Sequence, residues 1–438
     1  MFHSNKRAFA GVALATGAAL VLAGCAGGGD TPEAAPTFDP EAEVTLDFAF
    51  WGNDVRAEMY NEAITAFNEE YPNITVNPTF LSWDEYWEKR QTEAAGKNLP
   101  DVFQMDMTYV RQYSQNGLVL DLSPYLGGLI STDGFDQSVL DIATIEDTTV
   151  GMPVSTNALG MFENVVLTEE VGVEPFPGGT WEEYDAWLYE AQDAAEAAGL
   201  DVWGGADPTA FIQPFELILR SEGKSVFTED GEVGFTEEDL TDFWNRGQEL
   251  RDAGVVTPQQ RIEEVAPKGS FDAALSLTEV VWDNFGAPYL ANLGEAYAPL
   301  NLVAPPYVDE GAKDLYMKAG MLMSAAATSD APEAAAVFID FMVNSPEVGT
   351  IFGTNRGMPA SATMRDGIEI DSNAQQIIDY EASIADRIGD PPPVPIVGYG
   401  SIEAKFKELG QELGFGTITV DQAVDELFAE IDVILSSQ

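Results

Sequence analysis

The stretch VTLDFAFWGNDVRAEMYNEAITAFNEEYPNITV, residues 44–76, contains a complete strand–helix–strand unit. Its first residues alternate apolar side chains with others, which predicts a strand: Val44, Leu46, Phe48 and Phe50. Residues 55–71 then carry apolar side chains four positions apart, as an amphipathic helix does: Met59, Ala63, Phe67 and Tyr71. Ile74 and Val76 begin a second predicted strand, which Pro78 interrupts. The unit therefore predicts a sheet covered by helices.

The same pattern continues downstream. Ser82 and Glu85 have the spacing of a capping box ahead of a predicted helix that ends near Gly96. Residues 101–106 follow Pro100 as a third strand, so the order is strand, helix, strand, helix, strand. That order predicts a parallel sheet with helices on both faces and ligands beyond the carboxyl ends of its strands. Later capping boxes pair Thr180 with Glu183, Asp330 with Glu333, and Thr419 with Gln422, so we predict an α/β chain throughout.

Length and charge narrow the possibilities further. A chain of 438 residues is too long for one compact core and predicts two or three domains or lobes. The 20 Lys and Arg residues face 74 Asp and Glu residues, which gives a formal net charge of −54. Such a surface repels phosphate backbones and anionic headgroups, so we expect no nucleic-acid partner and no electrostatic membrane association.

The first 25 residues have the pattern of a bacterial lipoprotein leader. Lys6 and Arg7 precede an apolar run, residues 8–23, that is too short for a permanent membrane-spanning helix. The Leu-Ala-Gly-Cys sequence that ends at Cys25 resembles the lipobox, which implies lipidation of Cys25 and removal of residues 1–24. Residues 25–43 are rich in Gly, Pro, Ala and acidic residues, which predicts a flexible acidic stalk.

The rare residues limit the chemistry that remains. His3 and Cys25 are the only histidine and cysteine, and His3 would be lost with the leader. Ser-His-Asp triads, Cys-His pairs and His-ligated zinc sites are therefore excluded from the mature chain. The sequence also has no P-loop, no dinucleotide-binding glycine motif and no EF-hand loop. We therefore expect no catalytic residue, no metal and no cofactor, although a carboxylate-based glycosidase stays open.

Five segments resemble extracellular solute-binding protein family 1 and occur in the order found in that family. The family comprises the carbohydrate-binding lipoproteins of ABC importers that are similar to maltose-binding protein. The segments are 46–76, 83–106, 151–157 (GMPVSTN), 180–184 (TWEEY) and 338–361 (FIDFMVNSPEVGTIFGTNRGMPAS). The resemblance implies a periplasmic-binding-protein fold of two α/β lobes with the ligand between them. It places lobe one at 44–154 and 316–352, and lobe two at 158–312 and 356–438.

The resemblance also implies a function and partners. The expected protein captures a sugar or oligosaccharide by hinge closure and delivers it to ABC-transporter permease subunits. It would be a monomer, anchored through Cys25 at the extracellular face of the bacterial cytoplasmic membrane. The open alternatives are a lipid-anchored glycosidase, a structural or adhesion lipoprotein, and a binder of a polyol, a glycerol-phosphate diester or a peptide.

A pyranose has an apolar C–H face and a rim of hydroxyl groups, so its binder needs flat aromatic rings beside polar side chains. Residues of these types stand where predicted strands end or helices begin in lobe one: Trp51, Asn53, Asp54, Trp83, Tyr86, Asp106 and Tyr109. The corresponding candidates in lobe two and at the lobe crossings are Asn157, Trp203, Trp282, Asp283, Arg356, Met358 and Tyr399.

Trp282 and Tyr399 match aromatic positions of the family, and Trp203 is interpreted as the end of a strand. Arg356 lies at a predicted lobe junction, where it would contact ligand or form a salt bridge that fixes the hinge. Three further tryptophans inside helical patterns, Trp181, Trp187 and Trp244, are interpreted as structural.

Overall fold

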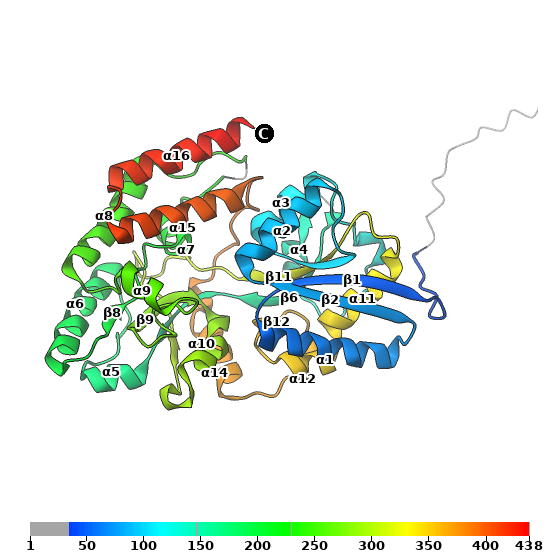
Figure 1. Ribbon diagram of the computed structural model, residues 1–438, viewed down its shortest axis with the longest axis horizontal. Coiled ribbons are helices and arrows are strands. Elements are labelled where there is room, and N and C mark those ends of the chain that lie inside the picture. Colours follow the sequence, from blue (N-terminus) through cyan, green and yellow to red (C-terminus); the bar gives the residue numbers. More distant parts are fainter. Residues whose placement is uncertain (1–34, 146–147, 229, 438) are drawn as a thin grey trace, which may run out of the picture. The chain divides into compact units, whose positions relative to one another are not determined.

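The computed structural model describes residues 35–145, 148–228 and 230–437 (Figure 1). The predicted signal peptide, Cys25 and the first part of the predicted stalk lie outside the described residues. The elements described below all belong to the unit Pro36–Gln438. Among the described residues, no helix is both long and apolar enough to cross a bilayer.

A six-stranded mixed sheet and the helices that cover it form one structural half of this unit, called the first half. Its strands are β1 (Val44–Trp51), β2 (Ile74–Leu81), β3 (Val102–Met105), β6 (Met152–Asn157), β11 (Lys318–Ala325) and β12 (Met358–Pro359). They are ordered β12-β6-β11-β3-β1-β2. Strand β1 is parallel to β2 and β3, which confirms the prediction from residues 44–106. The three later strands pair antiparallel, so the predicted parallel sheet is only half of the observed one.

A second, four-stranded sheet has the order β10-β7-β9-β8. Its strands are β7 (Leu159–Glu163), β8 (Trp203–Gly205), β9 (Ser276–Trp282) and β10 (Asn301–Val303). Strand β7 is antiparallel to both β9 and β10, whereas β8 is parallel to β9. A short antiparallel pair, β4 (Thr144–Ile145) with β5 (Thr148–Thr149), stands apart from both sheets.

Helices cover both sheets (Figure 1). Those that contribute to the core of the first sheet are α1 (Asp54–Glu70), α2 (Trp83–Ala95), α3 (Met107–Gln115), α4 (Gln137–Ile142), α11 (Pro332–Asn344), α12 (Pro346–Phe352) and α13 (Ala362–Arg365). Those around the second sheet are α5 (Val165–Val171), α6 (Trp181–Ala198), α7 (Ile212–Ser221), α8 (Glu237–Ala253), α9 (Gln259–Val265), α10 (Gly286–Leu293), α14 (Ser372–Ser383), α15 (Tyr399–Phe415) and α16 (Val420–Ser436). The mixed α/β prediction is confirmed.

The chain passes between the sheets more than once. Only Ala158 separates β6 of the first sheet from β7 of the second. The chain returns between β10 and β11, and leaves again after β12. The lobe boundaries given by the resemblance stay a prediction. They assign residues 356–438 to lobe two, whereas β12 pairs with β6 of the first sheet and Met364 belongs to the core of that sheet.

Two of the four predicted capping boxes form as expected. Thr180 and Thr419 each cap a helix through its third residue, at the starts of α6 and α16. The box at Ser82 is wrong, because the Ser82 hydroxyl donates to the Glu85 carboxylate at 2.7 Å and caps no backbone N–H. The box at Asp330 is also wrong, since Ala331 occupies the N-cap and Pro332 is the first helical residue.

The buried side chains divide by sheet. One large core joins β1, β3 and β11 to α1 and α11, and three smaller cores fill the region around the second sheet. The side chain of Trp244 is fully buried, and Trp181 and Trp187 are also buried, which confirms that these helical tryptophans are structural. Helices α15 and α16 pack against one another and place α15 beside α3 of the first half.

Candidate functional site

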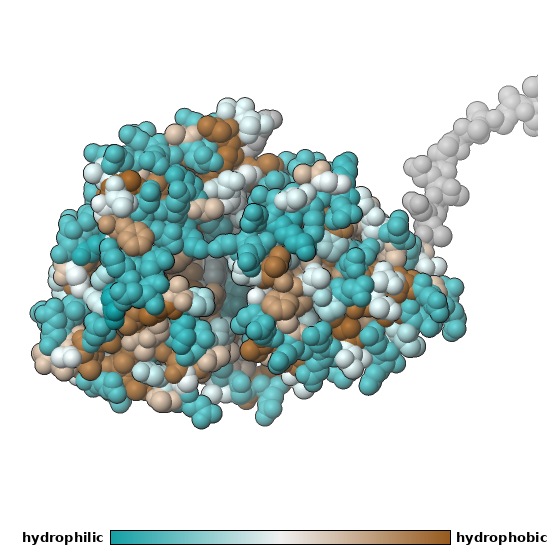
Figure 2. Space-filling model, in the orientation of Figure 1, coloured by the Kyte–Doolittle hydropathy of each residue, from teal (hydrophilic) through white to brown (hydrophobic). Residues whose placement is uncertain are grey.

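A cleft of about 1600 Å³ is lined by residues from both sheets and from helices α2, α3, α7, α10 and α15. The view in Figure 2 shows a largely hydrophilic face that is hollowed near its middle. Strands β1 and β9 both end at the cleft, since Trp51 and Trp282 are their last residues and both line it. Two of the residues predicted at strand ends therefore line the cleft, and their contact with a ligand stays a prediction.

Packed aromatic rings form one wall of the cleft. The rings of Trp51 and Trp83 meet edge to face with centroids 5.1 Å apart. Behind them, Trp87 stacks on Tyr109 at 3.8 Å between centroids. The side chain of Trp83 remains 37% exposed, because α2 begins at this residue and presents it to the cleft. The wall therefore has a rigid base and one accessible ring.

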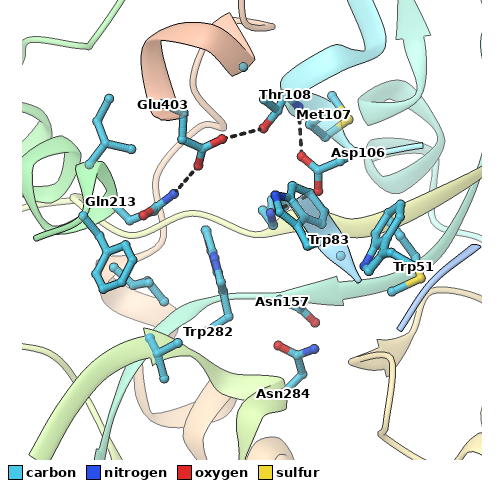
Figure 3. A pocket seen from close by; sticks show the side chains of 18 of the residues that line it. Trp51, Trp83, Asp106, Met107, Thr108, Asn157, Gln213, Trp282, Asn284 and Glu403 are labelled. Atoms are coloured by element: carbon cyan, nitrogen blue, oxygen red, sulfur yellow. Dashed lines mark hydrogen bonds and ion pairs between the residues drawn. The ribbon is translucent and has the colours of Figure 1, made fainter. Parts of the chain in front are cut away.

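Trp282 forms the facing aromatic group on the second sheet (Figure 3). Its ring contacts Tyr316 edge to face at 6.2 Å between centroids. The ammonium of Lys318 lies 4.4 Å from the centroid of the same ring, within range of a cation–π interaction. Trp282 is only partly buried, so part of its surface remains available in the cleft.

Carboxylates and hydrogen-bonding side chains lie between the two walls. Asp106 caps α3 by accepting from the backbone N–H of Thr108 at 2.9 Å, and its second oxygen lies 3.7 Å from the Lys318 ammonium. Glu403 on α15 accepts from the Thr108 hydroxyl at 3.3 Å and from the Gln213 amide at 2.8 Å (Figure 3). Burial raises the pKa of Glu403, the charge of Asp106 adds to this rise, and Lys318 opposes it.

Two of the asparagine side chains that line the cleft carry amide oxygens without a hydrogen-bond partner among the described residues. They are Asn157 Oδ1, at the end of β6, and Asn284 Oδ1, just after β9. Asn157 is 4% exposed, and both residues line the cleft. Figure 3 shows both amides projecting into the same part of the pocket as Trp282. A buried unpaired acceptor costs free energy until a donor reaches it, so these oxygens suit a ligand that donates hydrogen bonds.

Two further carboxylates in the cleft are held by tyrosines. Glu216 accepts from the Tyr316 hydroxyl at 2.8 Å, and Glu279 accepts from the Tyr289 hydroxyl at 2.6 Å. Burial raises the pKa of both carboxyls, and that of Glu279 reaches about 7. These groups hold their protons at a higher pH than exposed glutamates do.

Eight of the predicted binding residues line the cleft: Trp51, Asn53, Trp83, Asp106, Tyr109, Asn157, Trp282 and Tyr399. Tyr109 and Tyr399 approach it from helices α3 and α15. Asn53 also caps α1 by accepting from the backbone N–H of Arg56 at 3.0 Å. The cleft therefore brings together predicted residues from both sheets, and their contact with a ligand stays a proposal.

The other six predicted binding residues are not among those that line the cleft. Tyr86 is buried behind Trp51 and donates to the backbone oxygen of Gln104 at 2.7 Å. Asp54 is an exposed residue in the first turn of α1. Met358 is buried in a core of the second half. Burial in packing, or exposure outside the cleft, separates these side chains from the pocket.

Trp203, Asp283 and Arg356 differ most from their predicted places. Trp203 begins β8 rather than ending it, and pairs with Ser276 at the start of β9, the end of that strand opposite to Trp282. The carboxylate of Asp283 is fully buried and accepts from the backbone N–H of Ala158 at 2.9 Å. Arg356 is 1% exposed, with its guanidinium carbon 3.8 Å from the Phe352 ring centroid.

Several cleft residues lie outside the sequence predictions. They include Arg56, Phe211, Gln213, Lys318 and Glu403. Arg56 lines the cleft and donates to the side chain of Asn355, which also lines it, at 3.2 Å. Arg356, the next residue in the chain, does not line the cleft. Gln213 and Glu403 sit inside helical patterns, where a polar residue is indistinguishable from a solvated one until the helices pack.

Residues 53–348 match the family model described as bacterial extracellular solute-binding protein. This chain belongs to that family. The solute-binding protein is 21% identical over 274 residues to a binding protein of Brucella abortus (strain 2308), an alignment that covers 59% of this chain and 62% of that one. The chain therefore matches about three fifths of the length of this curated relative.

Solved structures agree with the fold. A periplasmic solute-binding protein from Pectobacterium atrosepticum superposes with a TM-score of 0.74 at 22% identity, covering 90% of this chain and 99% of that one. A periplasmic oligogalacturonide-binding protein from Yersinia enterocolitica, solved in complex with saturated digalacturonic acid, gives a TM-score of 0.71 at 21% identity with the same coverage. At these identities the likeness shows that this solute-binding protein has the fold of its family.

Proposed function

We propose that this solute-binding protein is the substrate-binding component of an ABC importer and captures a sugar or oligosaccharide in the cleft. The observation that carries the proposal is the pairing of aromatic rings on two walls, Trp83 and Trp282, with the unpartnered amide oxygens of Asn157 and Asn284. Rings stack on the C–H faces of a sugar, and the amide oxygens accept from its hydroxyl groups. The Yersinia relative is an oligogalacturonide-binding protein, which agrees with this chemistry.

The charge of the cleft favours a neutral or cationic ligand. Seven carboxyl groups line it. Burial raises the pKa of three of them, Glu216, Glu279 and Glu403, and the other four are Asp84, Glu88, Asp106 and Glu408. The cationic side chains that line it are Arg56, Lys318 and Lys407. Lys318 already faces Asp106, and Lys407 lies 3.8 Å from Asp84. An anionic ligand such as the digalacturonic acid of the Yersinia relative would meet an excess of negative charge here.

Capture would proceed by closure of two lobes on the ligand. A sugar that stacks on one wall gains the contacts of the other wall only when the lobes approach. A ligand shifts such an equilibrium by its difference in affinity for the two forms, and about 5.5 kcal/mol moves it from 1:99 to 99:1. Ring stacking and the satisfaction of two buried acceptors are interactions of the right size when several act together.

The proposed partners follow from the family and the leader. Cys25 would carry the lipid that holds the protein at the extracellular face of the bacterial cytoplasmic membrane, with the acidic segment after it as a tether. The loaded monomer would then deliver its ligand to permease subunits of the importer. The role is capture and release, so the ligand leaves the protein chemically unchanged.

A carbohydrate screen tests this function. We expect purified residues 26–438 to show a higher melting temperature with at least one neutral sugar, because ligand at 100 times its dissociation constant adds about 2.7 kcal/mol of stability. Incubation with the same sugar should produce no new reducing ends. The proposal fails if no carbohydrate changes the melting temperature, or if the sugar is hydrolysed.

A further inference from the structure

A second pocket of about 350 Å³ adjoins the cleft on the side of the second sheet. Four residues line both spaces: Phe211, Glu279, Lys407 and Gln411. They come from four places in the chain, namely the residue before α7, strand β9 and two positions of α15. The boundary between the two spaces, called the neck, is therefore built from a ring, a carboxylate, an ammonium group and an amide.

Phe211 is the exposed aromatic member of this neck. It is the N-cap residue of α7 and is 43% exposed. The neighbouring residue Ile212 is 3% exposed and belongs to the core, so α7 itself is firmly packed. The chain thus holds an apolar ring at the junction of two hollows, supported by a buried helix.

The walls of the second pocket are polar and include a buried ion pair. Arg251 on α8 donates to the Asp207 carboxylate at 2.6 Å and to the Thr209 hydroxyl at 3.2 Å. Both members of this ion pair are about nine-tenths buried. The side chain of Gln259 also lines the pocket and is 9% exposed. A compensated ion pair with amide and hydroxyl groups suits a neutral guest rich in hydroxyl groups.

The backbone around the pocket is closely packed, so its shape is built into the fold. A Cβ atom at Gly410 of α15 would lie 2.9 Å from the backbone oxygen of Ala210. A Cβ atom at Gly247 of α8 would lie 2.8 Å from the Cβ of Thr209. Glycine at these two positions lets both helices approach the loop that carries Phe211.

We propose that the ligand is an oligosaccharide that extends from the cleft across Phe211 into the second pocket, where its terminal ring binds. The inference rests on the proposed function and adds the length and direction of the substrate. Phe211 stacks on the ring that crosses the neck, while Lys407 and Gln411 hydrogen-bond its hydroxyl groups. Sugars too short to cross the neck use only the Trp83 and Trp282 walls.

Isothermal titration calorimetry on a length series of one neutral oligosaccharide, chosen by the screen, tests the proposal. We expect affinity to rise by at least tenfold between the shortest member that binds and the member that fills the second pocket. Phe211→Ala should remove most of that gain, so that the longest member loses much more affinity than the shortest. Tyr189→Ala is the matched control, because Tyr189 is 45% exposed on α6 and lines neither pocket.

A blocking variant gives a second, independent measurement. Gln260 is exposed at the start of α9 and lines only the second pocket, so Gln260→Trp fills this space without altering the core. Gln260→Trp should lower the affinity of long members at least tenfold, with Gln260→Ala as its control. Equal affinities along the series, or equal losses for short and long members, would overturn the extended path while sugar binding stands. Failure of every member to bind would refute the proposed function as well.

Discussion

The ammonium of Lys318, on the first sheet, lies 4.4 Å from the ring centroid of Trp282, on the second sheet. Lys318 begins β11 of the first sheet, whereas Trp282 ends β9 of the second. The same ammonium lies 3.7 Å from a carboxylate oxygen of Asp106. A single cation therefore links the main aromatic group of one half to a carboxylate of the other, and it covers part of the Trp282 surface.

Replacement of the Trp282 ring should affect ligand binding much more than folding. Trp282→Ala should weaken the sugar found by the screen at least tenfold, because it removes a stacking surface of the cleft. The melting temperature without ligand should stay nearly unchanged, since the ring is only partly buried. Calorimetry and thermal denaturation of the same preparation measure the two effects.

Trp203→Ala is the matched control for this experiment. Trp203 is also partly buried, but it starts β8 and does not line the cleft. Its replacement should leave the sugar affinity unchanged. A large loss of stability with unaltered affinity for Trp282→Ala would assign Trp282 to the core instead.

The buried carboxyl of Asp283 should support the chain crossing between the sheets. One oxygen accepts from the backbone N–H of Ala158, the residue between β6 and β7. Asp283→Ala leaves this buried N–H without its acceptor and should lower the free energy of unfolding by about 1–3 kcal/mol. Asp283→Asn keeps an acceptor and should cost clearly less. Urea denaturation of both variants measures the difference, and equal losses would contradict the role of this hydrogen bond.

The parallel half of the first sheet was predictable because its signals are local. Residues 44–106 contain strands and helices in alternation, and alternation specifies parallel neighbours without knowledge of the rest of the chain. The antiparallel strands β6, β11 and β12 come from distant segments that carry no local sign of their partners. The predicted parallel order was therefore correct for β1, β2 and β3 only.

The candidate site was predictable in part for a similar reason. Trp51 and Trp282 end strands, and strand ends can be read from a sequence. Arg356 was placed by its position near a lobe junction, but only packing decides that its side chain turns into the rings of Phe352 and Tyr60. Glu403 enters the cleft because α15 packs against α3, a contact between residues almost 300 positions apart.

Lipidation of Cys25 should decide where the protein is found. Cys25→Ser removes the proposed acceptor of the lipid and should release the full-length protein from the membrane fraction of expressing bacteria. The ligand affinity of the released protein should be unchanged, since Cys25 precedes the unit that contains the cleft. Cell fractionation followed by calorimetry measures both properties. Retention of Cys25→Ser in the membrane fraction would contradict the anchor.

The raised pKa of Glu279 should make folding stability depend on pH. Burial brings this pKa to about 7, above the ordinary value of 4.5. Between about pH 4.5 and 7 the folded protein keeps the proton of Glu279, whereas the unfolded chain has released it. The associated stabilisation is complete below about pH 4.5. It is lost as the pH rises through about 7.

Glu279→Gln isolates this contribution, because glutamine keeps an acceptor for the Tyr289 hydroxyl and does not titrate. Between pH 4.5 and 7.5 the wild type should lose about 1–3 kcal/mol more stability than Glu279→Gln. Glu381, whose pKa is also raised by burial to about 7, titrates in both proteins and cancels in the comparison. Glu249→Gln, at an exposed position of α8, removes the same formal charge and should follow the wild-type curve. Parallel stability curves for wild type and Glu279→Gln, measured by urea denaturation at each pH, would show that folding does not raise the pKa of Glu279.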